Sequence, residues 1–345
     1  RAQGRTMTSF PGRGPPASRS PGIDSDKCDM RALAKAGGEF LEAGNGVRVG
    51  GWRVETKTTP ILGKERLDAL EASLGTSHLP EMVFGSRLDL THEASGTTIH
   101  FNAECALREW LEEGLPPLKV AAAAVWARGH ERRFGGGMPG APAADRFAVE
   151  KTEKKKKPIP GSRAAWDERE DAEAYDWTFT TPYRGSLRTR ADGGAPSASG
   201  WTPTELRVDR GMLMERDPIL FFDELTLYES ELDDNGEMSV TLKVRVMPKC
   251  WYVLLRHWMR VDGVLLRLRE TRLFHKMVGA EGAAGAAGTA VVVVRESARR
   301  EETFEGLRAR GAPCEPGQYP NAEEAASVLL AAGGPVAMEH HALTL

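Results

Sequence analysis

Apolar and polar residues alternate most clearly between residues 217 and 275, and the pattern predicts antiparallel strands. A strand is predicted over 219–228, followed by an Asn235-Gly236 dipeptide that is typical of a hairpin turn. Beyond the turn, apolar residues at every second position predict a strand with one buried and one polar face. Residues 251–261 and 264–274 form a second predicted hairpin around Asp262-Gly263, although a helix over 251–260 also fits this apolar run.

A two-residue turn at Asp262-Gly263 would fix the register of this second hairpin. Val261 then pairs with Val264, and Leu255 pairs with Glu270, so one face of the hairpin is mostly apolar and should meet the core. The opposite face gathers four arginines around one tryptophan, and these residues are Arg256, Trp258, Arg260, Arg267 and Arg269.

Two functions are open for this predicted arginine face. Guanidinium groups offer paired donors to carboxylates, so the face suits an acidic peptide that ends in a carboxylate. A solvated outer face of a sheet explains it equally well. Glu270 and Arg272 fall on the apolar face, where burial without a partner would be costly, so a structural ion pair is favoured over a place in a cleft.

The rest of the chain adds helices and short strands. Strands are predicted at 52–55, 88–90 and 97–101, and a helix over Lys64–Leu74 ends at Gly75. Asn102 is expected to cap a helix that runs to about Leu111. Two further helices are predicted over 295–310 and 321–332. The fold class is therefore α+β, built mainly on antiparallel sheet with a few flanking helices.

Three segments lack the apolar periodicity that would offset the entropy of ordering them. They are a tail over 1–46 and two flexible insertions at 128–172 and 278–289. A single domain is therefore expected over 47–335, followed by a short tail at 336–345. The lysine run at 154–157 is expected to be a solvated linker, with nuclear import as the alternative.

Composition narrows the classes of function. The formal net charge is -3, which argues against a nucleic-acid binder. No stretch approaches the length of apolar sequence that spans a bilayer, so no membrane partner is expected. The four cysteines are far apart and are expected to be reduced thiols. His78, His92 and His100 match no metal-ligand spacing, and no metal or cofactor is predicted.

Seven blocks of sequence, in the same order along residues 50–335, resemble the TIPRL family, the TOR-signalling-pathway regulator-like proteins. They include LPEMVFG at 79–85, FNAECALR at 101–108, LKVA at 118–121 and YDWTFTTPYRG at 175–185. The others are VRVMP at 244–248, RVDGV at 260–264 and ETRL at 270–273. The sequence departs from the family pattern at its longer basic loop, at 278–289, and at Cys105, where the family usually has an acid.

The resemblance implies a non-catalytic regulator that binds the catalytic subunit of type 2A and related protein phosphatases. Family members act in TOR-linked signalling, in the cytoplasm and also the nucleus, and hold the phosphatase partly through the carboxyl-terminal tail of its catalytic subunit. Four residues of the 175–185 block are candidates for a recognition groove, with a core tryptophan beside a turn as the alternative: Asp176, Trp177, Tyr183 and Arg184. The competing hypothesis is a metal-dependent or acid–base enzyme of unrecognised type.

An acidic stretch over 223–237 remains outside this hypothesis. It contains seven carboxylates and a partial match to a calcium loop, but Leu242 stands where the loop needs a bidentate glutamate. A solvated hairpin is favoured, and contact with a basic patch of a partner is the alternative.

Overall fold

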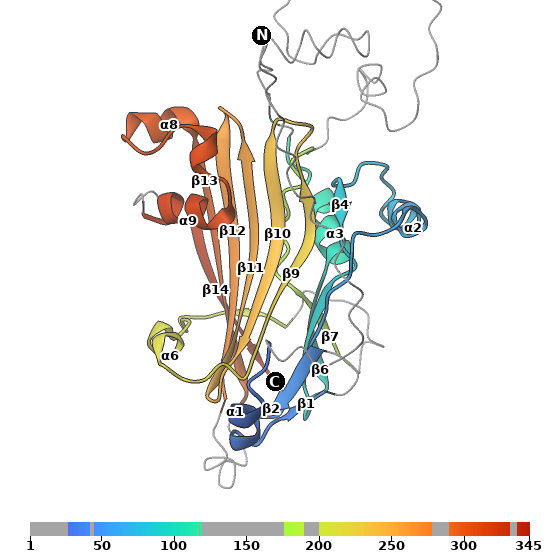
Figure 1. Cartoon of the computed structure of the whole chain (residues 1–345), viewed down its shortest axis with the longest axis vertical. Helices are drawn as coiled ribbons and strands as arrows, with labels where there is room; N and C mark the ends of the chain where they lie inside the picture. Colours follow the sequence, from blue (N-terminus) through green and yellow to red (C-terminus); the bar gives the residue numbers. More distant parts are fainter. Residues whose placement is uncertain are drawn as a thin grey trace, which may run out of the picture.

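The computed structural model describes residues 27–41, 45–116, 118, 176–189, 200–277, 290–331 and 337–345. Its architecture is mostly antiparallel β, with two sheets that face each other (Figure 1). The α+β fold class predicted from the sequence is confirmed. The predicted insertions at 128–172 and 278–289 lie outside the described residues.

The smaller sheet has six strands in the order β1-β2-β3-β5-β6-β7, all antiparallel. Its strands are β1 (Glu39–Phe40), β2 (Asn45–Val49), β3 (Trp52–Lys57), β5 (Arg87–His92), β6 (Thr97–Asn102) and β7 (Ser186–Arg188).

The larger sheet has eight strands in the order β4-β9-β10-β11-β12-β13-β14-β8, again all antiparallel. Its long central strands are β9 (Phe221–Ser230), β10 (Gly236–Val246), β11 (Cys250–Val261), β12 (Leu265–Lys276) and β13 (Val292–Thr303). The remaining three, nearer the edges, are β4 (Met82–Val83), β14 (Ala337–Thr344) and β8 (Thr202–Pro203).

Helices flank the sheets on both sides (Figure 1). Beside the smaller sheet are α2 (Lys64–Leu74) and α3 (Ala103–Glu113), and α1 (Met30–Lys35) lies at the lower end of the sheets in this view. On the opposite side of the larger sheet are α6 (Arg210–Met214), α8 (Phe304–Ala309), a short 3-10 helix η2 (Pro316–Gln318) and α9 (Ala322–Ala331).

The main core lies between the two sheets. It joins residues from Cys28 to Leu343 in one cluster, including the fully buried Trp52, Trp110 and Trp251. This inner face of the larger sheet is therefore apolar along most of β9–β11. A second cluster on the outer face packs Trp258, Leu266 and Leu268 against α8, η2 and α9.

Local signals in the sequence placed several elements correctly. The helix Lys64–Leu74 has its predicted bounds, and Gly75 ends it with φ +71°. Asn102 caps α3 as predicted, because its side-chain oxygen accepts a hydrogen bond of 2.8 Å from the backbone N–H of Cys105. The four cysteines are free, as expected.

Three predictions of local structure are wrong. The predicted tail over 1–46 contains α1 and β1 and the start of β2, held by Lys27, which pairs with buried Asp223 at 2.7 Å. The predicted tail at 336–345 is β14, which pairs with β13. The predicted helix over 295–310 is mostly β13, and only 304–309 is helical. For β13 and β14, pairing with a strand that is distant in the sequence decides the structure, and short-range periodicity does not report it.

Candidate partner-binding site

The register of the β11–β12 hairpin differs from the prediction by one residue. The turn contains three residues, so Val261 pairs with Leu265 and Arg256 pairs with Glu270. A slip of one residue moves a strand's side chains to the other face of the sheet. The predicted single arginine face is therefore wrong: Arg256 and Arg260 lie on the outer face, whereas Arg267 and Arg269 lie on the inner face.

On the outer face, a buried carboxylate binds two arginines. Glu270 accepts hydrogen bonds from Nε and Nη2 of Arg256, at 2.8 and 2.5 Å, and another from Arg272. Arg256 also reaches Glu323 of α9 at 3.0 Å. The side chain of Glu270 is only 1% exposed. The predicted pairing of Glu270 with Arg272 is confirmed, although on the opposite face from the one predicted, and this network holds the helix layer to the sheet.

Trp258 and Arg260 are also covered on this outer face. Trp258 is 2% exposed and packs in the cluster beneath α8 and α9. Arg260 donates to the backbone carbonyl of Tyr319 at 2.7 Å and to Asp262 at 2.6 Å. These outer-face residues thus serve mainly to fasten the segment 304–331 to the sheet.

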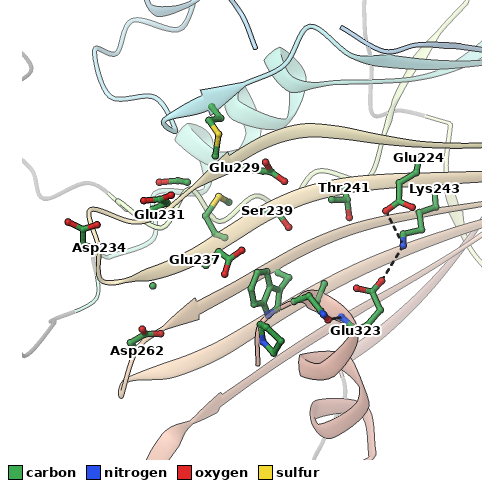
Figure 2. A pocket seen from close by; sticks show the side chains of 18 residues that line it. Glu224, Glu229, Glu231, Asp234, Glu237, Ser239, Thr241, Lys243, Asp262 and Glu323 are labelled. Carbon is green, nitrogen blue, oxygen red and sulfur yellow. Dashed lines mark hydrogen bonds and ion pairs between the residues drawn. The ribbon is translucent and has the colours of Figure 1, made fainter. Parts of the chain in front are cut away.

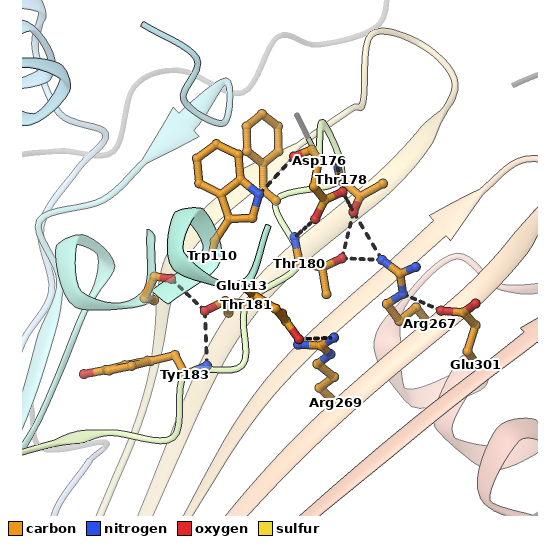
Figure 3. Close-up of polar contacts among 12 residues, drawn as sticks. Trp110, Glu113, Asp176, Thr178, Thr180, Thr181, Tyr183, Arg267, Arg269 and Glu301 are labelled. Atoms are coloured by element: carbon orange, nitrogen blue, oxygen red, sulfur yellow. Dashed lines mark hydrogen bonds and ion pairs between the residues drawn. The ribbon is translucent and has the colours of Figure 1, made fainter. Parts of the chain in front are cut away.

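On the inner face, Arg267 ends a chain of polar contacts that begins at Asp176 (Figure 3). The Asp176 carboxylate accepts hydrogen bonds from the backbone N–H groups of Thr178 and Thr180, at 3.0 and 3.2 Å. Arg267 donates to the Thr180 hydroxyl at 2.5 Å and to Glu301 at 2.6 Å. Burial raises the pKa of Asp176, and these donors partly offset that rise.

Trp177 and Tyr183 have structural contacts in the same segment. Trp177 is half-buried and donates its indole N–H to the Leu118 carbonyl at 3.1 Å. Tyr183 is 3% exposed, and its hydroxyl donates to the His100 carbonyl at 2.9 Å. The segment 176–183 therefore crosses between α3 and the larger sheet as packed structure, and the side chain of Arg184, which follows it, is 20% exposed.

The open part of the inner face carries four arginines, which we call the inner arginine cluster. Arg269 pairs with Glu113 of α3 through two bonds of 2.6 and 3.0 Å (Figure 3), and Arg184 pairs with Glu339 of β14 at 2.5 Å. The other members of the cluster are Arg295 and Arg299 of β13.

Arg295 and Arg299 differ from the paired members. The Arg295 guanidinium lies 4.2 Å from the ring centre of Trp201, and burial followed by repulsion from Arg184 lowers its pKa to about 10. Arg299 is exposed and makes no ion pair with any described residue; burial, Arg269 and Arg184 lower its pKa. A small cavity of about 20 Å³ lies between Arg184, Arg269 and Arg299, large enough for one water molecule. Arg184 and Arg269 are thus paired with acids, whereas Arg295 and Arg299 make no ion pair with any described residue.

Nearby groups tune this cluster. The half-buried Glu109 on α3 has a pKa raised to about 7, first by burial and then by Glu112. His257 lines the small cavity and is 2% exposed; burial, Arg269 and Arg267 hold its pKa well below the ordinary value. His257 is therefore neutral at physiological pH and adds no charge to the cluster.

Arg295 and Arg299 were missed by the sequence reasoning because residues 295–310 were predicted as a helix. A signal was present: four consecutive valines at 291–294 favour a strand, and Arg295, Ser297 and Arg299 then alternate onto one face.

Two of the histidines considered for a metal site, His92 and His100, contact different partners. Nδ1 of His92 lies 3.0 Å from the Ser95 hydroxyl, and Nδ1 of His100 lies 2.5 Å from Asp89. Among the described residues, no group of three or more His, Cys, Asp or Glu could hold a metal ion. No helix in the described ranges is long and apolar enough to cross a membrane.

Comparison with known proteins agrees with the sequence blocks. The profile of the TIP41-like family matches residues 82–308. A TIP41-like protein of Arabidopsis thaliana is 40% identical over 296 residues, 83% of this chain and 87% of that protein. The human TIP41-like protein is 34% identical over 66% of this chain and 70% of its own length. The type 2A phosphatase activator TIP41 of Saccharomyces cerevisiae is 28% identical over 78% of this chain and 66% of its own length. The chain belongs to the TIP41-like family.

Proposed function

We propose that this chain is a non-catalytic regulator of type 2A protein phosphatases that binds their catalytic subunit. The observation that carries the proposal is the family match over 82–308, together with the names of two yeast relatives, from Saccharomyces cerevisiae and Schizosaccharomyces pombe, as type 2A phosphatase activators. A place in TOR-linked signalling, in the cytoplasm and the nucleus, is part of the same proposal.

The finer proposal concerns the mode of binding. The inner arginine cluster holds the carboxyl-terminal tail of the catalytic subunit, with Arg299 and Arg184 as the residues that meet its carboxylate. Arg299 makes no ion pair with any described residue, and Glu339, the acid that pairs with Arg184, is 45% exposed. An incoming carboxylate would relieve the repulsion among these guanidinium groups, which favours its binding.

The opposite hairpin face supports this choice of site by elimination. Arg256 and Arg272 are already bound to buried Glu270, and Trp258 lies beneath α9. A tail peptide on that face would have to displace the helix layer. Charge reversal of Arg256 would therefore test stability, whereas charge reversal of Arg299 tests binding.

The test is capture of a purified phosphatase catalytic subunit, either complete or without its tail, by the full chain. Arg299→Glu is expected to weaken capture of the complete subunit about tenfold or more, because it replaces a charge-assisted contact by repulsion. Arg308→Glu on α8 is the matched control, since it reverses one exposed arginine away from the cluster.

The outcomes separate the two levels of the proposal. Equal capture of the complete and the tail-less subunit, or an Arg299→Glu variant that binds like the unmodified chain, overturns the tail mode alone. Failure of the unmodified chain to capture either subunit overturns the proposed function itself.

A further inference from the structure

The outer face of the larger sheet is open over β9 and β10, beside the layer formed by α8 and α9. A groove with a volume of about 600 Å³ lies there (Figure 2). Its floor is formed by side chains of β9, β10 and β11, the start of α9 forms one wall, and Met82 of β4 lies at the other side. It is separated from the inner arginine cluster by the full thickness of the sheet.

The groove is strongly acidic. Lys243 is the only basic side chain among its lining residues, and it is already held by Glu224 at 3.0 Å and Glu323 at 3.2 Å. The lining carboxylates number seven, and they are Glu224, Glu229, Glu231, Asp234, Glu237, Asp262 and Glu323.

Three of these carboxylates have no cation to balance them. Glu229, Glu231 and Asp234 make no ion pair with any residue in the described part of the chain. Burial, and then repulsion from Glu237, raises the pKa of Glu229, and burial also raises the pKa of Glu237. Excess negative charge is therefore concentrated in a partly desolvated space, where a bound cation is attracted more strongly than on an open surface.

A buried polar group without a partner lies at the same place. Trp258 lines the groove and is 2% exposed, yet its indole N–H has no hydrogen-bond partner among the described residues. A buried donor of this kind is costly unless something accepts its hydrogen. Of the four tryptophans with such an N–H in the described residues, Trp258 is the one that lines this groove.

The spacing of the acids fits an extended chain. On β10, Ser239 is paired with Glu229 of β9, and Lys243 is paired with Glu224. Glu237 precedes Ser239 by two residues, and Lys243 follows Ser239 by four. At about 3.3 Å per residue these intervals are roughly 7 and 13 Å. An extended peptide laid along β10 would meet them with basic side chains at its positions i, i+2 and i+6.

We propose that this acidic groove binds an extended lysine- or arginine-rich segment of a partner protein. Charge complementarity selects the chemistry, because phosphates and acidic peptides are repelled. The three cationic side chains meet Glu229, which makes no ion pair with any described residue, and Glu237 and Glu224, whose partners are Arg260 at 3.7 Å and Lys243 at 3.0 Å. Trp258, which lines the groove, lies close to the bound segment and can report on its binding. The groove and the inner arginine cluster lie on opposite faces, so the segment binds independently of the proposed phosphatase contact.

The experiment uses the full chain and a fluorescein-labelled peptide with lysines at its second, fourth and eighth positions and threonine or serine between them. Fluorescence anisotropy is expected to show binding that weakens as salt rises from 50 to 300 mM. Glu229→Gln combined with Glu237→Gln should weaken binding at least about fivefold, from the loss of two charge contacts. The matched control is Glu65→Gln with Asp68→Asn, which removes two exposed charges from α2 and should leave binding unchanged.

A second readout places the peptide at the groove. In ¹⁵N-labelled protein, the indole resonance of Trp258, assigned by Trp258→Phe, should shift on titration with the peptide. In the Glu229→Gln, Glu237→Gln variant the same shift should need at least about fivefold more peptide. Unchanged binding by that variant, or equal binding of a peptide with glutamates in place of the lysines, would overturn the proposal. So would binding that emerges only after residues 154–157 are changed to glutamine, because the chain's own lysine run would then be the occupant.

Discussion

The two faces of the β11–β12 hairpin carry similar residues but different surfaces. Outer Arg256 is bound to Glu270 of the same hairpin and lies under α9, whereas inner Arg269 reaches across to Glu113 of α3. Where the helices stop, the outer face leaves acids uncovered and the inner face leaves Arg299 uncovered. The sign of each exposed surface is therefore decided by which side chains the covering layers leave unpaired.

The largest expected effect comes from breaking the outer ion network. Glu270→Gln leaves Arg256 and Arg272 facing each other beneath α9, and the free energy of unfolding should fall by about 3 kcal/mol. Urea titration followed by fluorescence measures the change, and the exposed Glu65→Gln should stay within about 0.5 kcal/mol. A loss below about 1 kcal/mol would mean that the network is not needed to hold the helix layer.

On the inner side of the larger sheet, the contribution of Glu109 to the stability of the fold should depend on pH. The folded-state pKa of Glu109 is about 7 against an ordinary value of 4.5, so the native state binds the extra proton between these values. The stability from this group is complete below about pH 4.5 and is lost as pH rises through 7. Because Glu109 is partly exposed, we expect the unmodified chain to lose about 1 kcal/mol more than Glu109→Gln between pH 5 and pH 8. Denaturation curves of both proteins at the two pH values measure this difference. An equal loss of stability in both proteins, or a larger loss in Glu109→Gln, would contradict the prediction.

The turn that sets the two faces apart should tolerate little change. Gly263 has φ +70° and no neighbouring atom would touch an added Cβ, so Gly263→Ala should cost about 1 kcal/mol through backbone strain alone. Thermal unfolding measures the cost, and Gly317→Ala is the control, since Gly317 also has free space but no positive φ. Equal effects of the two substitutions would argue against the three-residue turn.

The smallest expected effect distinguishes the groove acids from Glu270. Because burial and mutual repulsion raise the pKa values of Glu229 and Glu237, replacing both by glutamine should raise stability by up to about 0.5 kcal/mol. A loss of stability would indicate that these acids are structural, as Glu270 is, and would weaken the contrast between the two outer regions.

The sequence predicted most of the strands and missed how they are placed. Alternation located β9 to β12, and the caps at Gly75 and Asn102 located two helices, because those signals depend on neighbouring residues. The site was harder, because one additional residue in the turn, Val264, moved Arg267 and Arg269 to the other face. Arg299 could be found only by recognising β13, which depends on pairing with β12 and β14.

The strand order of the larger sheet bears on how the chain folds as it is synthesised. Its edge strands β4 and β8 are made before the neighbours they pair with, since Val83 pairs with Tyr228 and Thr202 pairs with Ala342. These segments therefore stay unpaired until the ribosome has added more than a hundred further residues. Such long-range closure slows folding and leaves strand edges open to other chains. Cells that make this protein quickly would therefore be expected to depend on chaperones that shield those edges.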